Sequence, residues 1–108
     1  MRTGPARVPA AVGAAAYRIV QESLTNAVRH GGPGAVVRVD VGLADEVLTV
    51  RVTDDGTASV AAGGSGYGIL GMRERARSVG GTLSAGPRAS GGFEVAAALP
   101  LQAREVMA

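Results

Sequence analysis

The sequence predicts an α+β domain, a two-layer sandwich in which a mixed, mostly antiparallel sheet carries its helices on one face. Three observations lead to this prediction. An apolar stripe with helical spacing fills residues 12–27, strict alternation recurs at 37–53 and 93–99, and short turns separate neighbouring strands. Short turns join antiparallel strands, so most of the sheet should be antiparallel. The predicted order is helix, two strands, loop, helix, two strands.

Length and composition limit the function classes. The 108 residues fit one domain, with residues 1–8 expected as a flexible lead-in, 9–101 as the domain and 102–108 as a tail. The 11 basic residues are scattered and not interleaved with aromatics, so nucleic acid is not an expected partner. Without cysteine there is no disulfide or thiol chemistry, and one histidine is too few for a metal cluster. No signal peptide or apolar run of membrane length is seen, so we expect a cytoplasmic domain without direct membrane contact, alone or within a longer membrane protein.

The first helix is expected to begin near Pro9 and to end at the run Gly31-Gly32-Pro33-Gly34. Its buried stripe is formed by Val12, Ala16, Ile19, Val20, Ser23 and Ala27. At about 100° per residue, a second line of polar residues runs beside that stripe, namely Glu22, Asn26 and His30. The outward side carries Arg18, Gln21, Thr25 and Arg29. Three polar groups should therefore lie at the margin of the core, where they either border a cleft or simply meet water.

The strands and the second helix follow from alternation and glycine stops. Residues 35–43 place Val37, Val39 and Val41 on one face, and residues 47–53 turn Leu48, Val50 and Val52 inward. The short link between them predicts a hairpin. The second strand ends at the tight turn 54–56, a mobile loop covers 57–65, and a helix spans 69–79. Strands at 82–85 and 93–99 complete the sheet.

Three segments carry candidate chemistry. In Glu22-x-x-x-Asn26, an amide oxygen beside a carboxylate suits magnesium, and the carboxylate could accept a proton. In Asp54-Asp55-Gly56, one carboxylate could accept a hydrogen bond from a ligand amine, or both could serve only the turn.

The third segment is the glycine-rich run at 63–71, whose backbone N–H groups precede a helix and could hold phosphate, or could form a flexible linker. Gly66 to Gly71 matches G-x-G-x-x-G, but a small-residue loop precedes it where a dinucleotide-binding fold needs a strand. We therefore reject that fold. No G-K-[S/T] follows, so the segment is not a Walker loop.

In this order and spacing, the three segments resemble the nucleotide-binding boxes of the GHKL ATPase superfamily, which includes gyrase, the heat-shock chaperone ATPases, mismatch-repair ATPases and histidine kinases. Residues 17–30 resemble the N box, 54–56 the G1 box and 66–75 the G2 box. Three short segments are most similar to sensor histidine kinases of the nitrate-sensor type, namely Arg-Ile-Val-Gln-Glu, Gly-Met-Arg-Glu-Arg and Gly80-Gly81-Thr82-Leu83. The resemblance covers residues 12–101 and implies a Bergerat-type fold.

The resemblance implies ATP and Mg²⁺ as cofactors and assigns roles to single residues. Asn26 would hold Mg²⁺ on the phosphates, and Glu22 would assist the metal-bound water or the phosphoryl acceptor as catalytic residue and metal ligand. Asp54 would accept the adenine amino group, and Gly56 would let the backbone turn under the ring. Residues 63–72 would form the ATP lid. The other implied nucleotide-binding residues are Arg29, His30, Gly64, Gly66, Gly68, Ile69, Leu70, Gly71, Met72 and Thr82.

The implied function is that of the ATP-binding catalytic domain of a two-component sensor histidine kinase. The γ-phosphoryl group of ATP would pass to a histidine on dimerisation helices of the same protein, and indirectly to a response regulator. The acceptor helix is absent from this chain, and His30 is not the acceptor. The isolated domain should therefore bind Mg-ATP without completing the reaction.

Two positions depart from the family pattern. Ala58 stands where D-x-G-x-G has its last glycine, and Phe93 stands where relatives commonly carry Thr. Two alternatives follow: an anti-sigma-factor-type serine kinase, which uses the same boxes, and a degenerate nucleotide-binding module that serves protein interaction. A titration with Mg-ATP separates the last from the two enzymes.

Overall fold

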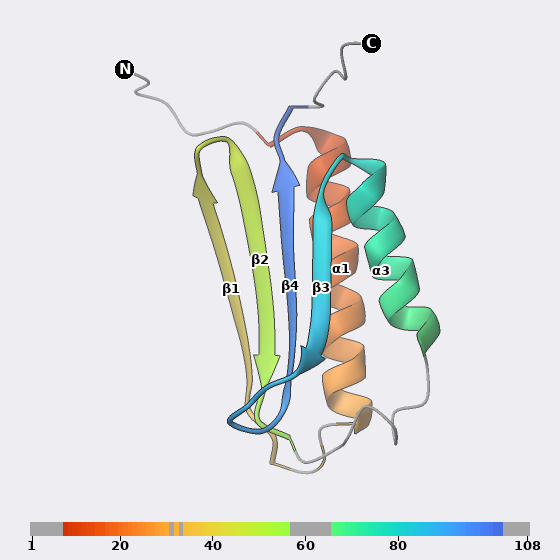
Figure 1. Cartoon of the computed structure of the whole chain (residues 1–108), viewed down its shortest axis with the longest axis vertical. Helices are drawn as coiled ribbons and strands as arrows, with labels where there is room; N and C mark the ends of the chain where they lie inside the picture. The colour runs from red at the N-terminus through yellow and green to blue at the C-terminus, as the bar shows by residue number, and fades with distance from the viewer. Residues whose placement is uncertain (1–7, 31, 33, 57–65, 103–108) are drawn as a thin grey trace.

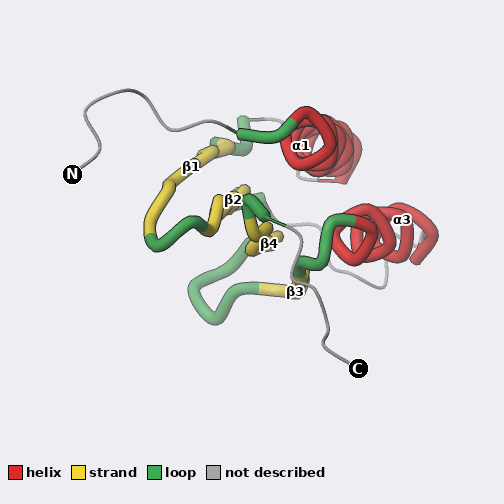
Figure 2. The backbone as a smooth tube through the Cα atoms, turned by 90° about the horizontal axis from the view of Figure 1, so that it is seen from above, coloured by secondary structure: helices red, strands yellow, loops and turns green. Residues whose placement is uncertain are grey.

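The computed structural model describes residues 8–30, 32, 34–56 and 66–102. With the labels of Figure 1, the elements are α1 (Ala10–His30), β1 (Val37–Ala44), β2 (Val47–Asp54), α3 (Gly66–Ser78), β3 (Thr82–Pro87) and β4 (Phe93–Pro100). The strands form one sheet in the order β1-β2-β4-β3, and each neighbouring pair is antiparallel. Both helices cover the same face of the sheet (Figures 1 and 2). The predicted two-layer α+β fold is confirmed.

Helix α1 forms because its first half is rich in alanine and its apolar residues repeat with helical spacing. The N–H of Gly13 donates to the carbonyl of Pro9 at 2.9 Å, which closes the first turn. At the other end, Gly32 and Gly34 have positive φ and stop the helix. The buried residues of α1 are Val12, Ala15, Ile19, Ser23 and Ala27, while Ala16 and Val20 are half-buried. Neither described helix is long and apolar enough to cross a membrane.

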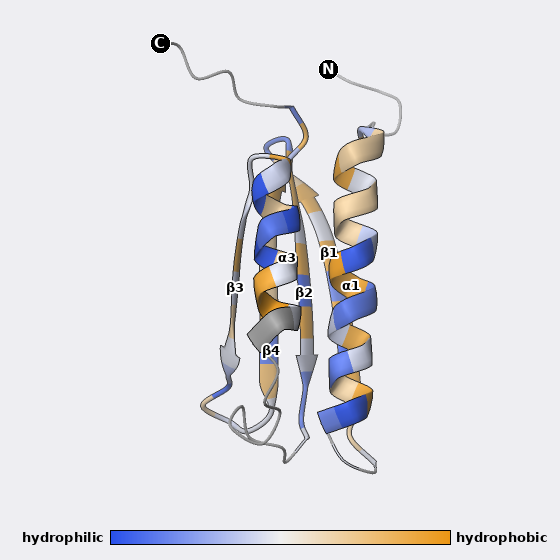
Figure 3. Cartoon of the chain, turned by 90° about the vertical axis from the view of Figure 1, so that its right-hand side faces the viewer, coloured by the Kyte–Doolittle hydropathy of each residue, from blue (hydrophilic) through white to orange (hydrophobic). Residues whose placement is uncertain are grey.

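The core lies between α1, α3 and the middle of the sheet. Strand β2 contributes Leu48, Val50 and Val52, as predicted, and β4 contributes Val95, Ala97 and Leu99. Ile19 and Leu99 are fully buried. Burying a side chain of this size stabilises the fold by about 1.5–3 kcal/mol. Figure 3 shows the helices from the side that faces away from the sheet. On this side, the C-terminal halves of α1 and α3 are mostly hydrophilic.

The second helix begins earlier than the sequence predicts. Helix α3 starts at Gly66, inside the glycine-rich run, whereas glycine's low helix propensity led us to expect a start at residue 69. Its core-facing residues are Ile69, Met72 and Ala76, spaced three or four apart, and Val79, directly after the helix, packs against the same core. The burial of this face explains why the helix extends into the glycines. The predicted loop at 57–65, most of the predicted lead-in and most of the predicted tail fall outside the described residues.

Strand β1 lies at the edge of the sheet, beyond the cover of the helices. Its residues Val39, Val41 and Leu43 pair with the core residues Val52, Val50 and Leu48 of β2, so they point to the helix-covered face. They nevertheless remain 40%, 61% and 42% exposed. The hairpin turn that joins β1 to β2 uses Asp45 and Glu46, both with positive φ. Two such residues match the right-handed twist of a tight hairpin.

The turn before β4 approaches the end of β2 very closely. Gly92 has φ +87°, and a Cβ atom built on it would lie 1.8 Å from the carbonyl oxygen of Asp54. The next residue, Phe93, is the register partner of Asp54. Only glycine allows both this backbone conformation and this approach. Gly92 therefore fixes how the last strand meets the turn that follows β2.

We predict that Gly92→Ala lowers the free energy of unfolding by about 3 kcal/mol, because strain at positive φ adds to a steric clash with backbone. Urea unfolding followed by circular dichroism measures this loss. The matched control is Gly86→Ala, since a Cβ at Gly86 meets nothing within 4 Å and its φ is not positive. The control should change stability by less than about 1 kcal/mol. Equal stability of both variants would contradict the assigned role of Gly92.

Candidate functional site

The candidate residues gather at one end of the domain, the lower end in Figure 1. Four pieces of chain meet there: the last turns of α1, the end of β2, the start of α3 and the turn between β3 and β4. The two helices run in opposite directions, so the C-terminal end of α1 lies beside the N-terminal end of α3 (Figures 1 and 3). This arrangement joins segments that are about 40 residues apart in the chain.

Glu22 and Asn26 form a polar wall that faces the first turn of α3. A Cβ atom added at Gly68 would lie 2.9 Å from Oε2 of Glu22 and 3.5 Å from Nδ2 of Asn26. Both side chains are half-buried, at the margin of the core, as the helical spacing predicts. The absence of a side chain at Gly68 therefore lets the backbone of α3 approach the carboxylate and the amide together.

The two aspartates after β2 have different tasks. Oδ1 of Asp55 accepts a hydrogen bond from the N–H of Val36 at 2.7 Å, and the N–H of Asp55 donates to the carbonyl of Val36. Asp55 thus ties the end of β2 to the start of β1. Oδ1 of Asp54 accepts from the N–H of Gly56 at 2.8 Å, which forms the local turn. Asp54 is half-buried and Asp55 is exposed. A carboxylate accepts through both oxygens, so Asp54 keeps capacity for a further donor.

Two residues expected to bind nucleotide have side chains that belong to the core. Met72 is 1% exposed, and its Sδ lies 3.4 Å from Oγ of Ser23, which also donates to the carbonyl of Ile19. Ile69 packs against the same core cluster. The helical repeat that starts at Gly66 turns positions 69 and 72 inward, so any contact of these residues with nucleotide stays a prediction about their backbone.

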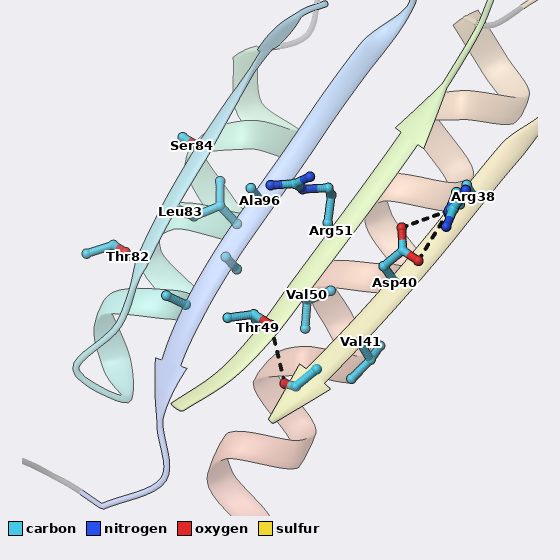
Figure 4. A pocket seen from close by; sticks show the side chains of 13 residues that line it. Arg38, Asp40, Val41, Thr49, Val50, Arg51, Thr82, Leu83, Ser84 and Ala96 are labelled. Carbon is cyan, nitrogen blue, oxygen red and sulfur yellow. Dashed lines mark hydrogen bonds and ion pairs between the residues drawn. The ribbon is translucent and has the colours of Figure 1, made fainter. Parts of the chain in front are cut away.

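Thr82 lies away from the candidate site. Its register partner in β4 is Ala98, whereas the partner of Asp54 is Phe93, five residues further along, or about 17 Å. Thr82 lines a hollow of about 670 Å³ on the sheet face without helices, together with Thr49, Ser84 and Ala98 (Figure 4). The structure therefore corrects the expectation for Thr82, because the chain direction of β3 places its first residue at the opposite end of the domain.

The charged groups around that hollow are paired with one another. Arg38 contacts Asp40 at 3.0 Å, and Arg51 contacts Glu94 at 2.9 Å. These exposed pairs satisfy their charges within the sheet face, and small residues such as Ala96 leave the hollow open (Figure 4). Among the described residues that line this hollow, no unpaired carboxylate lies beside an amide or a helix start.

The remaining expected residues have mixed positions. Arg29 and His30 occupy the last turn of α1, where Arg29 is exposed and His30 is half-buried. A positively charged side chain at this position interacts favourably with the negative, C-terminal end of the helix dipole. Leu70 and Gly71 are exposed on α3, and Gly56 is buried in the turn after Asp54. Gly66 begins α3, while Gly64 and Ala58 fall outside the described residues.

Two residues of the site escaped the sequence analysis. Nη1 of Arg88 donates to the carbonyl of Asp54 at 3.2 Å, and Gly92 packs against the same carbonyl. The pair Gly91-Gly92 before a predicted strand is a signal that could have indicated a special turn, but not which part of the chain the turn would meet. No sequence signal identified Arg88 as a neighbour of Asp54.

The donor set fits a magnesium-bound nucleotide. In the described ranges, from 8 to 56 with two gaps and from 66 to 102, no group of three or more His, Cys, Asp or Glu side chains could hold a metal on its own. Mg²⁺ needs few protein ligands when phosphates and water supply the rest, so one carboxylate and one amide suffice. The start of α3 presents backbone N–H groups beside them, a setting that suits phosphate.

Comparisons with known proteins agree with this geometry. The family described as histidine kinase-, DNA gyrase B- and HSP90-like ATPases matches residues 11–103. The sensor histidine kinase YxjM of Bacillus subtilis is 38% identical over 87 residues, which are 79% of this chain and 20% of that protein. LnrJ, a sensor histidine kinase of the same organism, is 34% identical over 97 residues, or 90% of this chain and 24% of its own length. This chain thus spans about a fifth to a quarter of these curated relatives.

A solved structure of the blue-light activated histidine kinase of Erythrobacter litoralis EL346 superposes with a TM-score of 0.72 at 25% identity. The match covers 87% of this chain and 32% of that one. The relatives named above are sensor histidine kinases, and this chain is similar to one part of them. Since the family match extends over most of the chain and includes all three boxes, the chain belongs to the histidine kinase-, DNA gyrase B- and HSP90-like ATPases.

Proposed function

We propose that this domain binds Mg-ATP at the end where α1, β2 and α3 meet and that, within a longer protein, it delivers the γ-phosphoryl group to a histidine. The observation that carries the proposal is the close approach of Gly68 to both Glu22 and Asn26. It puts a helix start, a carboxylate and an amide at one place, which are the groups that a metal-bound triphosphate requires.

On the phosphate side, Asn26 and Glu22 are the proposed magnesium ligands. When bound, Mg²⁺ neutralises charge that develops on the transferred phosphoryl group. Glu22 also orients the metal-bound water or the incoming acceptor. The backbone of Gly66, Gly68 and Gly71 and the surface at Leu70 form the described part of the proposed lid, with Gly64 in its undescribed part. Arg29 and His30 border the phosphates from the end of α1.

On the base side, Asp54 is the proposed acceptor for the exocyclic amine of adenine, with Gly56 under the ring. Each of the two carboxylates already accepts one backbone hydrogen bond through Oδ1, Asp54 from Gly56 and Asp55 from Val36. Asp54 is half-buried whereas Asp55 is exposed, and this difference in burial supports Asp54 as the reader of the base.

For the longer protein, we propose transfer to a histidine on its dimerisation helices, a response regulator as the indirect partner, a cytoplasmic position and a nitrate-sensor-type kinase. Residues 9–101 are the proposed domain. The relatives favour this function over an anti-sigma-factor-type serine kinase, since those named above are sensor histidine kinases.

The first test of the proposal is calorimetric titration of the chain with Mg-ATP. Asn26→Asp should weaken binding about tenfold, because it places a second negative charge beside Glu22 and the triphosphate. Gln21→Glu is the matched control, since it makes the same change of charge on the exposed side of α1. Equal affinity of the Asn26 variant and the parent would remove Asn26 from the site, and no binding by the parent would favour a degenerate module.

Base selection distinguishes the two aspartates. The parent should prefer ATP to GTP at least about tenfold, because guanine would oppose its carbonyl oxygen to the carboxylate of Asp54. Asp54→Asn should weaken ATP binding and narrow that preference. Asp55→Asn is the matched control, because its amide oxygen can still accept from the N–H of Val36. Loss of preference in the Asp55 variant alone would transfer the base-reading role to Asp55.

The chain alone should not phosphorylate itself on histidine. Incubation with γ-labelled ATP, followed by separate acid and alkali treatment, detects phosphohistidine by its acid lability. We expect none, because the one histidine of the chain is His30 of the proposed phosphate-bordering edge, and the proposed acceptor histidine lies on the dimerisation helices. Acid-labile label on His30 would contradict the assignment.

A further inference from the structure

The turn between β3 and β4 folds back toward the end of β2. The N–H of Arg88 donates to the carbonyl of Gly92 at 2.9 Å, and the N–H of Gly91 donates to the carbonyl of Arg88 at 3.0 Å. These two bonds close the turn at both ends. They fix the backbone of Arg88, so the direction in which its side chain leaves the turn is set.

The guanidinium of Arg88 ends at the carbonyl of Asp54. Nη1 donates to that oxygen at 3.2 Å, and the contact is partly buried. Gly92 packs against the same carbonyl from the backbone side. Phe93, the register partner of Asp54, offers no hydrogen-bonding side chain. Among the hydrogen bonds of the described residues, Arg88 is the side chain that links this turn to Asp54.

The carbonyl and the carboxylate of Asp54 are each held by a hydrogen bond at the turn after β2. The carboxylate is held against the N–H of Gly56, two residues on, and the carbonyl is held by Arg88. A rotation of the peptide after Asp54 would swing that carbonyl away from Arg88 and would also displace the N–H of Gly56 that holds the carboxylate. A donor that is always charged makes a stronger hydrogen bond than a neutral one, so it restrains that rotation.

We propose that Arg88 is a positioning residue that orients Asp54 for the recognition of adenine. The inference depends on the proposed function, because it assigns to Arg88 a part in base selection by Asp54. Arg88 acts on the nucleotide only through that aspartate. Its removal should therefore change which base is preferred, and not merely how stable the domain is.

The test is a double-mutant cycle on the 108-residue chain, with ATP and GTP affinities measured by calorimetry. Arg88→Met keeps an apolar stem of similar length and removes the donors. It should weaken ATP binding about tenfold, the effect of losing one hydrogen bond from a charged group, and should leave GTP nearly unchanged. In the Asp54→Asn background, the same change should have little further effect. Arg88→Lys keeps a charged donor and should restore most of the preference.

The control is Arg51→Ala, which removes another arginine that holds a partner, Glu94, on the outer face of the sheet. It should leave the ratio of ATP to GTP affinity at the parental value. If Arg88→Met does not fold, Arg88→Leu, which also carries no donor, takes its place in the cycle.

Two results would overturn the inference about Arg88 and leave the proposed function intact. One is an unchanged ratio of ATP to GTP affinity in Arg88→Met. The other is a loss of ATP affinity on Arg88→Met that is as large in the Asp54→Asn background as in the parent. In both cases the parent would still prefer ATP and Asp54→Asn would still reduce that preference. If the parent binds neither nucleotide, the proposed function fails and the inference fails with it.

Discussion

Burial of one stripe of α1 against the sheet determines both the core and the candidate site. Ile19 is fully buried at the centre of that stripe, and Ser23 and Ala27 continue it toward the end of the helix. Successive residues turn by about 100°, so fixing these positions also fixes Glu22 and Asn26 at the margin. The polar wall cannot shift without lifting apolar side chains out of the core. Rigid support of this kind is what a binding site needs.

The same reasoning explains how much the sequence alone could predict. The polar line of α1 and the alternation of β2 depend on local periodicity and were predicted correctly, and the α1 stripe was predicted except that Ala15 is buried in place of Ala16 and Val20. The burial of the Met72 side chain and the position of Thr82 were not predicted, because they depend on where α3 begins and on which end of the domain β3 starts. The contact of Arg88 with Asp54 joins residues 34 apart and follows from a turn geometry that no periodicity encodes.

Charged side chains have different partners on the outer face of the sheet and at the candidate site. On the outer face, Arg38 and Arg51 each contact a carboxylate, and such exposed pairs contribute little to stability. At the candidate site, the carboxylates of Glu22 and Asp54 face backbone groups and a helix start instead. Within the part of the chain that the structure describes, neither carboxylate forms an ion pair, so both can still accept from a ligand. This contrast distinguishes the candidate site from the hollow of Figure 4.

The exposed edge of the sheet has a consequence for the behaviour of the chain in solution. Within the described residues β1 pairs on one side only, and Val39, Val41 and Leu43 stay partly exposed along it. An unpaired strand with an apolar face is a template onto which further strands can add. The charges of Arg38 and Asp40 on the opposite face of β1 keep that strand hydrated and oppose such growth. Their ion pair thus acts as a gatekeeper of solubility more than as a support of the fold.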